Sequence, residues 1–211
     1  MYLNFLQTDE EKKAFIKMAI IVAIANVEDD NEEKNEKESI FNNTPKNHLY
    51  ASGLLYLGKP KYEINFSENT DWKMSRLEEA IINGFMKELE LSLYEISTDG
   101  FNEIIDELSP VLAKLTRLSE EERRLEIIEK LIEDSISWDE VGDITPKSSR
   151  SMMIELISVA LVDNDYAPLE KVVIKSVANK LKIDSDELEE MENFVRSMKE
   201  IYKSGLEIIN N

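Results

Sequence analysis

The chain has 211 residues, of which 44 are acidic and 25 are basic, so its formal net charge at neutral pH is −19. Phosphate backbones and anionic membranes repel such a chain, and we therefore expect it not to bind nucleic acid. Cysteine is absent and His48 is the only histidine, which excludes disulfides, cysteine nucleophiles and thiolate zinc sites. These features agree with a cytoplasmic protein, and the apolar content of 42% is normal for a globular one.

The first predicted helix begins at Thr8. Thr8 and Glu11 have the spacing of a capping box, in which a hydroxyl and a carboxylate satisfy the first backbone N–H groups. The following run, residues 14–25, is apolar nearly all round and Lys17 is its only charged residue. This pattern is typical of a helix inside a bundle. Because a membrane helix needs roughly 20 apolar residues, we expect a buried core helix and no transmembrane segment.

A similar helix is predicted to open at Thr145 and to end near Asn164, before a short acidic turn. Pro168 then opens the next helix, because the missing N–H of proline would be unpaired at a first helical position anyway. Glu170 follows at the third position, where a carboxylate can accept a hydrogen bond from the N-cap N–H. Since Ala167 is a poor N-cap, we expect Glu170 to cap this helix.

The two apolar helices suggest a weak internal repeat. When Thr8 is aligned with Thr145, the two apolar runs coincide. The predicted fold is therefore all-α, a helical bundle built on two related helix-loop-helix halves in a single domain, residues 1–211. The first half is 8–41, the insertion is 42–142 and the second half is 145–210.

The insertion, residues 42–142, is predicted to add a helical layer. Pro, Gly and Asn interrupt residues 42–70, where 54–66 fits a short hairpin or, in its first part, a helical turn. Residues 71–142 have mostly helical apolar spacing, with one brief turn around Trp138. We expect this layer to pack on the two halves.

The last predicted helix, which Asp184 caps, carries a wide apolar stripe. Its apolar residues follow a heptad spacing from Leu188 to Ile209, and Phe194, Ile201 and Ile208 widen the stripe. A stripe this wide is more often a core face than a coiled-coil seam. We therefore expect it to face the core of a monomer, with a homodimer as the alternative.

The acidic turn carries the motif Val162-Asp163-Asn164-x-Tyr166-x-x-x-Glu170. It resembles the Ala-Asp-Gly-x-hydrophobic-x-x-x-Glu signature of the tellurite-resistance TerB-like family, over residues 146–183 and weakly over 8–40. Asn164 replaces the signature glycine, and Asn is the next best residue for a left-handed helix end. The resemblance implies two helical halves and a stress-response protein whose acidic loop holds a divalent cation.

The candidate metal ligands are Asp163, Asp165 and Glu170, with Ca²⁺ or Mg²⁺ as the cation. Backbone carbonyls of Asn164 or Tyr166 could add oxygens. Because Ca²⁺ takes about six to eight oxygen ligands, water or the first-half loop would have to complete the site. The alternative is that Glu170 only caps its helix while the two aspartates face solvent.

No catalytic constellation is present in the sequence. It contains no Gly-rich phosphate loop, no Gly-x-Ser-x-Gly elbow and no His-Glu-x-x-His pair. We therefore expect a TerB-like, non-enzymatic stress-response or interaction protein with a protein partner. The alternative is an acidic interaction module without metal, for example a DNA mimic or an inhibitor that occupies a basic groove.

Overall fold

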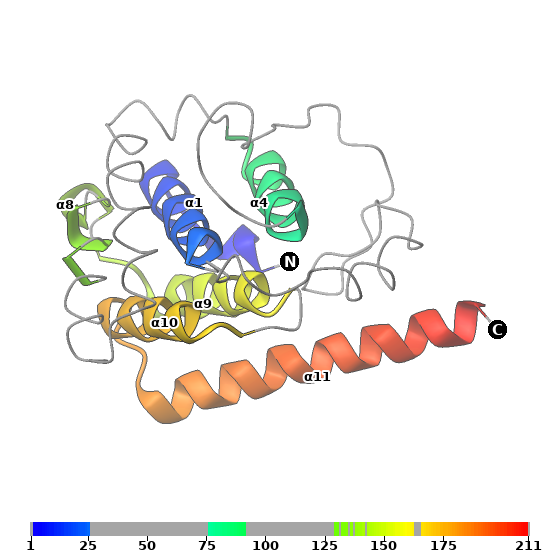
Figure 1. Ribbon diagram of the computed structural model, residues 1–211. Coiled ribbons are helices and arrows are strands. Elements are labelled where there is room, and N and C mark those ends of the chain that lie inside the picture. The colour runs from blue at the N-terminus through cyan, green and yellow to red at the C-terminus, as the bar shows by residue number, and fades with distance from the viewer. Residues whose placement is uncertain are drawn as a thin grey trace.

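A computed structural model of the chain describes residues 2–25, 76–91, 129–130, 132–134, 136, 138–141, 143–162 and 166–210. In this part of the chain every regular element is a helix, which confirms the all-α prediction (Figure 1). The hairpin predicted near 54–66 lies outside the described residues. The elements are η1 (Leu3–Phe5), α1 (Asp9–Ile24), α4 (Arg76–Glu88), α8 (Trp138–Val141), α9 (Pro146–Ala160), α10 (Pro168–Lys180) and α11 (Ser185–Asn210).

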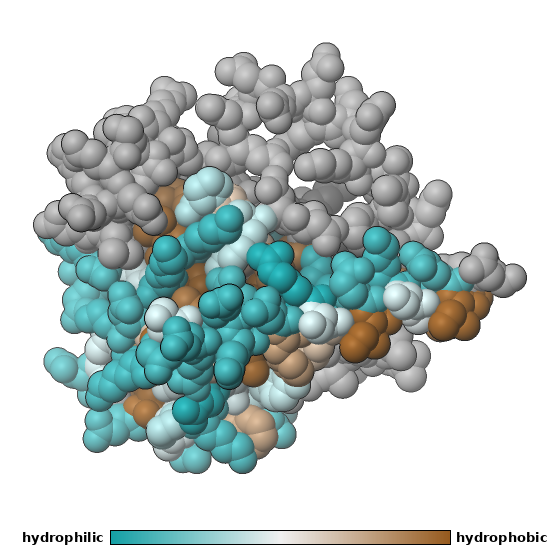
Figure 2. Space-filling view, turned by 90° about the horizontal axis from the view of Figure 1, so that it is seen from below, coloured by the Kyte–Doolittle hydropathy of each residue, from teal (hydrophilic) through white to brown (hydrophobic). Residues whose placement is uncertain are grey.

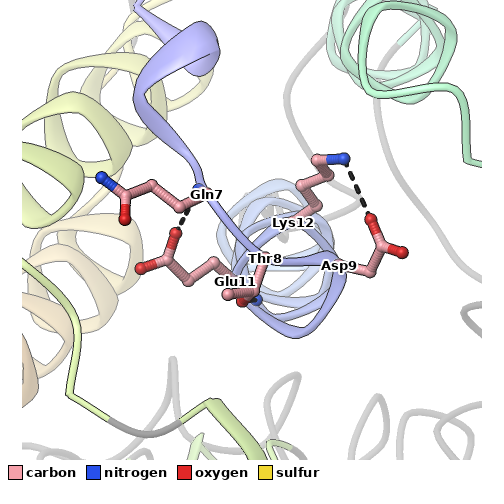
Figure 3. A network of polar contacts seen from close by, with 5 residues as sticks. All are labelled: Gln7, Thr8, Asp9, Glu11 and Lys12. Atoms are coloured by element: carbon pink, nitrogen blue, oxygen red, sulfur yellow. Dashed lines mark hydrogen bonds and ion pairs between the residues drawn. The ribbon is translucent and has the colours of Figure 1, made fainter.

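Helix α1 begins where the capping pattern predicts. The hydroxyl of Thr8 accepts a hydrogen bond from the Glu11 N–H at 3.1 Å. The Glu11 carboxylate accepts from the backbone N–H of Gln7, one residue earlier than in a regular capping box (Figure 3). On the outer side, Lys12 and Asp9 form an ion pair at 2.9 Å. These bonds fix the point at which the chain turns from η1 into α1.

The predicted burial of α1 is confirmed, because every residue from Ala14 to Ala23 is buried. Helices α4, α8, α9 and α10 all contact α1. The rings of Phe15 on α1 and Phe85 on α4 meet edge to face, with 5.2 Å between their centroids. An offset contact of this kind adds specific geometry to the burial of apolar area. Helix α1 is therefore enclosed in the bundle.

Helix α9 lies against α1 at the centre of the bundle, as predicted (Figure 1). Thr145 caps it by accepting from the Ser148 N–H at 3.1 Å, with Pro146 in the first turn. The buried Ser148 hydroxyl donates to the carbonyl of Phe5 at 3.0 Å and so ties η1 to α9. The Ser158 hydroxyl donates to a carbonyl of its own helix. The buried hydroxyls of Ser148 and Ser158 are thus both hydrogen-bonded to backbone carbonyls.

The described parts of the insertion cover the two central helices. Helix α4 contacts both α1 and α9, and α8 contacts α1. The brief turn predicted around Trp138 is confirmed as α8, and the Trp138 indole N–H donates to the carbonyl of Ile132 at 3.3 Å. One continuous hydrophobic cluster includes residues from all the described helices. The expectation of a helical layer packed on the halves agrees with these contacts.

The first half of α11, residues 185–195, faces the bundle as predicted. The Asp184 carboxylate accepts from the Glu187 N–H at 2.9 Å and caps the helix. Leu188, Met191 and Val195 are buried against the core. This part of α11 packs on α9.

The second half of α11, residues 196–210, departs from the predicted core face. Ile201 is 73% exposed, and Ile208 and Ile209 are each 78% exposed. The helix of 26 residues continues past the end of α9, which has 15 (Figure 1). At 1.5 Å per residue these lengths are roughly 39 and 22 Å, so α9 cannot cover all of α11. The predicted core stripe is therefore wrong at Ile201, Ile208 and Ile209, whereas Tyr202, Gly205 and Leu206 beside them are half-buried.

None of the described helices combines the length and the apolar character that a membrane-spanning helix requires.

Leu156→Asp tests the central position of α9. The Leu156 side chain is fully buried, and an aspartate there would place an unpaired charge in the core. We expect the variant to lose its cooperative thermal transition, measured by circular dichroism. Leu156→Ala should keep the transition but lose about 3 kcal/mol of stability.

Asn4→Asp is the matched control, because it adds the same carboxylate at an exposed position of η1. It should melt as the wild type does. A cooperative, wild-type melting curve for Leu156→Asp would contradict the packing described for α9.

Candidate functional site

Glu170 stands where the sequence predicts a capping residue. Helix α10 begins with Pro168 after the N-cap Ala167, whose own side chain offers no hydrogen bond. Glu170 Oε2 accepts from the Ala167 N–H at 2.7 Å, and the side chain is fully buried. The negative carboxylate also lies at the positive end of the helix dipole. The predicted capping role of Glu170 is therefore confirmed.

The other two predicted ligands, Asp163 and Asp165, lie outside the described residues, so their convergence with Glu170 stays a prediction. Helix α9 ends at Ala160 and Val162 lies in the following turn, slightly before the predicted end at Asn164. In the part of the chain that the structure describes, no three Asp, Glu or His side chains are grouped so as to hold a metal ion.

Tyr166 follows the acidic turn and lies in the junction between α9 and α10, which we define as residues 161–167. Side chains of α10 and α11 contact it. The Tyr166 hydroxyl donates to Glu192 Oε1 at 2.8 Å. The cationic groups of Lys171 and Arg196 lie 5.1 and 5.7 Å from the centre of the Tyr166 ring, within range of a cation–π attraction. Burial, followed by the neighbouring Glu192 carboxylate, raises the pKa of Tyr166, so the hydroxyl stays protonated as a donor. Side chains of α10 and α11 thus fix one end of the junction.

Lys199 of α11 fixes the other end of the junction. Its ammonium group donates to the carbonyls of Leu161 and Val162, with 3.4 Å to the Val162 oxygen. These carbonyls follow the last turn of α9, where a positive charge is favourable for the helix dipole. Lys199 therefore already supplies a positive charge beside the loop in which the sequence places a cation.

Sequence reasoning missed the contribution of α11 to this junction. Glu192, Arg196 and Lys199 are spaced by four and three residues, so they share one side of the helix. That spacing was a usable signal for a polar contact face beside the apolar stripe. The identity of the contacted loop was not readable, because it depends on how α11 crosses α9.

Glu155 is a second site that sequence reasoning missed. It is the only charged residue in the apolar run 152–162, and this isolation was the available signal. The side chain is fully buried in α9. Oε1 accepts from the Tyr2 backbone N–H at 3.0 Å, while Oε2 has no hydrogen-bond partner within the described residues. Burial raises the pKa of Glu155 to about 7, the Tyr2 N–H opposes the rise and nearby Glu88 adds to it.

An open depression lies between residues 129–134 and α10, lined by Glu129, Lys130, Glu133, Asp134, Ser176, Asn179 and Lys180. Lys180 and Glu133 form an ion pair across it, and the Lys180 ammonium also lies 5.8 Å from the centre of the Trp138 ring. These contacts join α10 to the insertion. The depression therefore has a structural explanation in the packing of the two segments.

Comparisons of the chain with protein-family models, with curated proteins and with solved structures found no match. The TerB-like resemblance therefore rests on the motif of residues 162–170.

Calorimetric titration with Ca²⁺ and Mg²⁺ tests the cation site. We expect the wild type to bind at millimolar cation and the double variant Asp163→Asn with Glu170→Gln to lose that binding, because carboxylates are the preferred ligands of hard cations. Glu170→Gln alone is the control for folding, because its amide oxygen can still accept from the Ala167 N–H. Absence of binding by the wild type, or equal binding by the double variant, would show that the ligand assignment is wrong.

The raised pKa of Glu155 predicts how the stability of the protein depends on pH. Its folded pKa of about 7 lies above the ordinary value of 4.5, so the folded state holds the proton more tightly. The contribution of Glu155 to the free energy of unfolding should therefore be fully present below pH 4.5 and be lost as the pH rises to about 7, by up to roughly 3 kcal/mol. Urea unfolding measured across this pH range tests the prediction.

Glu155→Gln should remove this part of the pH dependence, since the amide oxygen can still accept from the Tyr2 N–H but does not titrate. Glu189→Gln, at an exposed position of α11, is the matched control and should keep the wild-type profile. Identical profiles for wild type and Glu155→Gln would mean that Glu155 is not buried as described.

Proposed function

We propose that the protein is a TerB-like, non-enzymatic interaction protein, which binds another protein chain through the second half of α11. The observation that carries this proposal is the exposure of Ile201, Ile208 and Ile209, at 73%, 78% and 78%. Figure 2 shows hydrophobic surface gathered toward that end of the molecule. Contiguous exposed apolar surface on a soluble protein marks an interaction site more often than scattered single residues do.

The exposed residues share one helix with the junction contacts, and this supports the proposal. Lys199 and Glu192 connect α11 to the loop between α9 and α10. A partner bound to the second half of α11 would therefore act on the same helix that holds this loop. A divalent cation at Asp163, Asp165 and Glu170 is the second element of the proposal, because its binding would then be linked to the position of α11.

A second candidate function is an acidic module that occupies a basic groove of another protein, as a DNA mimic does. The net charge of −19 favours it. So do the carboxylates exposed over the first turns of α11, namely Asp184, Asp186, Glu189 and Glu190. Binding of this kind weakens steeply with added salt and competes with DNA, whereas apolar binding through isoleucines does neither.

Affinity capture with a tagged chain, from host cells that express the untagged chain, tests the proposed surface. Ile201→Glu should abolish capture of protein partners, because it places a charge in the apolar contact. Asn193→Glu is the control, since it adds the same charge at an exposed position of α11. Each capture is repeated with a chelator to test the role of the cation.

Equal capture by wild type and Ile201→Glu would contradict the proposed surface. Capture that both variants retain, and that added salt weakens and DNA displaces, would favour the acidic module instead.

A further inference from the structure

One edge of α11 changes from acidic to uncharged where the helix leaves the bundle. Residues seven apart lie close to the same edge of a helix, which is the basis of heptad packing. On this edge Glu187 is followed at intervals of seven by Phe194, Ile201 and Ile208. A second row beside it, again at intervals of seven, consists of Glu190, Ser197 and Ser204. The Phe194 ring meets the Tyr2 ring of its own chain edge to face, whereas Ile201 and Ile208 are largely exposed.

The charges of the second half of α11 are confined to the other side of the helix. At 3.6 residues per turn, its five charged residues fall within an arc of about 100°. The remaining arc contains apolar residues, serines and Gly205. The charged residues are Arg196, Lys199, Glu200, Lys203 and Glu207.

The charge of this segment also differs from that of the rest of the chain. Residues 196–210 hold three basic and two acidic side chains, a net charge of +1, whereas the whole chain carries −19. Two copies of the chain repel each other at most of their surface. The second half of α11 is a place where they can approach without that repulsion.

We propose that this uncharged edge binds the same edge of a second copy in an antiparallel pair, which gives a twofold-symmetric dimer. The inference rests on the proposed function and names its partner. A twofold contact uses one patch on both copies and therefore needs a patch that is complementary to itself.

The spacing of large and small residues satisfies this requirement. In an antiparallel pair centred at residue 203, Ile201 of each copy faces Gly205 of the other, and Met198 faces Ile208. A Cβ atom built on Gly205 would meet nothing within 4 Å, so open space lies beside it. Glycine in an exposed helix costs about 1 kcal/mol relative to alanine, and close approach of a partner isoleucine would offset that cost.

Burial and charge select this arrangement over its alternatives. A register shifted toward the bundle would place Ile208 against Met191, which is already buried in its own chain. A parallel pair would bring Glu187 and Glu190 of both copies together. Val195 is the last residue of the half of α11 that packs on the bundle. In the antiparallel pair the two Val195 residues lie about 24 Å apart along the axis, so the two acidic bundles are separated by well over the screening length of about 8 Å at physiological salt.

Sedimentation equilibrium of the pure protein, from low micromolar to near millimolar concentration, tests the dimer. The wild type should form dimers with a micromolar dissociation constant, and the dimer should persist at high salt, because its contact is apolar and the acidic bundles lie beyond the screening length. Ile201→Glu with Ile208→Glu should raise the dissociation constant by roughly 100-fold or more.

The matched control is Asn193→Glu with Lys203→Gln, because it changes the net charge by the same amount on the other side of the helix. It should dimerise as the wild type does. Both double variants should keep the wild-type thermal transition when dilute.

Disulfide formation tests the orientation, and the absence of cysteine makes the chain suitable. An equimolar mixture of the Met198→Cys chain and the Ile208→Cys chain should cross-link to each other. The Ile208→Cys chain alone should not, since in the antiparallel pair its two thiols lie far apart. Cross-linking of Ile208→Cys with itself would instead show a parallel pair and overturn the inference.

A wild type that stays monomeric at every concentration would also overturn the inference. If Ile201→Glu still abolished capture of another protein, the proposed function would stand with a different partner. If the isoleucine variants lowered the stability of that monomer, a segment of the same chain covers the edge. If neither occurred, the surface would have no binding role and the proposed function would fail as well.

Discussion

The burial of α9 beyond its first turn is the constraint on which the rest of this structure depends. Eleven of its 15 residues are buried, and from Ser151 to Ala160 no residue is exposed, so this part of α9 must be covered on every side. Helices α1, α4, α10 and α11 and the short η1 all contact it. Buried serines of α9 donate to backbone carbonyls, as Ser148 does to Phe5. The neighbouring helices are arranged as they are because each must cover part of α9.

The length of α9 also explains the two different halves of α11. Over the first half, α11 covers α9 and contributes Leu188, Met191 and Val195 to the core. Beyond the end of α9, α11 continues and still carries apolar residues, of which Ile201, Ile208 and Ile209 are exposed while Tyr202 and Leu206 are half-buried. An isolated helical segment of this length is only marginally stable in water, so its order depends on the rest of α11 or on a partner. The residues packed in the core and the exposed isoleucines thus lie on consecutive parts of one helix.

Local signals in the sequence predicted the helix starts well. Thr8, Thr145, Asp184 and Glu170 all act as the caps that their positions indicated, since capping depends on residues within one turn. The central contact of α1 with α9 was also predictable, because both are apolar nearly all round. The wide stripe of α11 was misjudged at Ile201 and beyond, because periodicity shows that a face is apolar but not where its cover ends.

The contacts of the candidate site were less predictable, because they too depend on how the helices pack and not on local sequence. Glu170 was found because its capping role is local. The bonds of Lys199 to the end of α9 and of Tyr2 to Glu155 join residues 37 or more positions apart, and only the crossing of helices brings them together. The buried Glu155 ties η1 to the centre of the bundle, so the N-terminal segment and the protonation of the core are connected.

Amide hydrogen exchange along α11, measured at several protein concentrations, tests most directly whether one helix combines a packed half with an uncovered half. In dilute solution the amides of residues 188–198 should exchange slowly and those of 201–210 more quickly, since the first group includes the buried Leu188, Met191 and Val195 while no side chain from 201 to 209 is fully buried. Exchange of the second group should slow as the concentration rises, while that of the first group stays unchanged. Equally slow exchange over the whole of α11 at the lowest concentration would contradict the account.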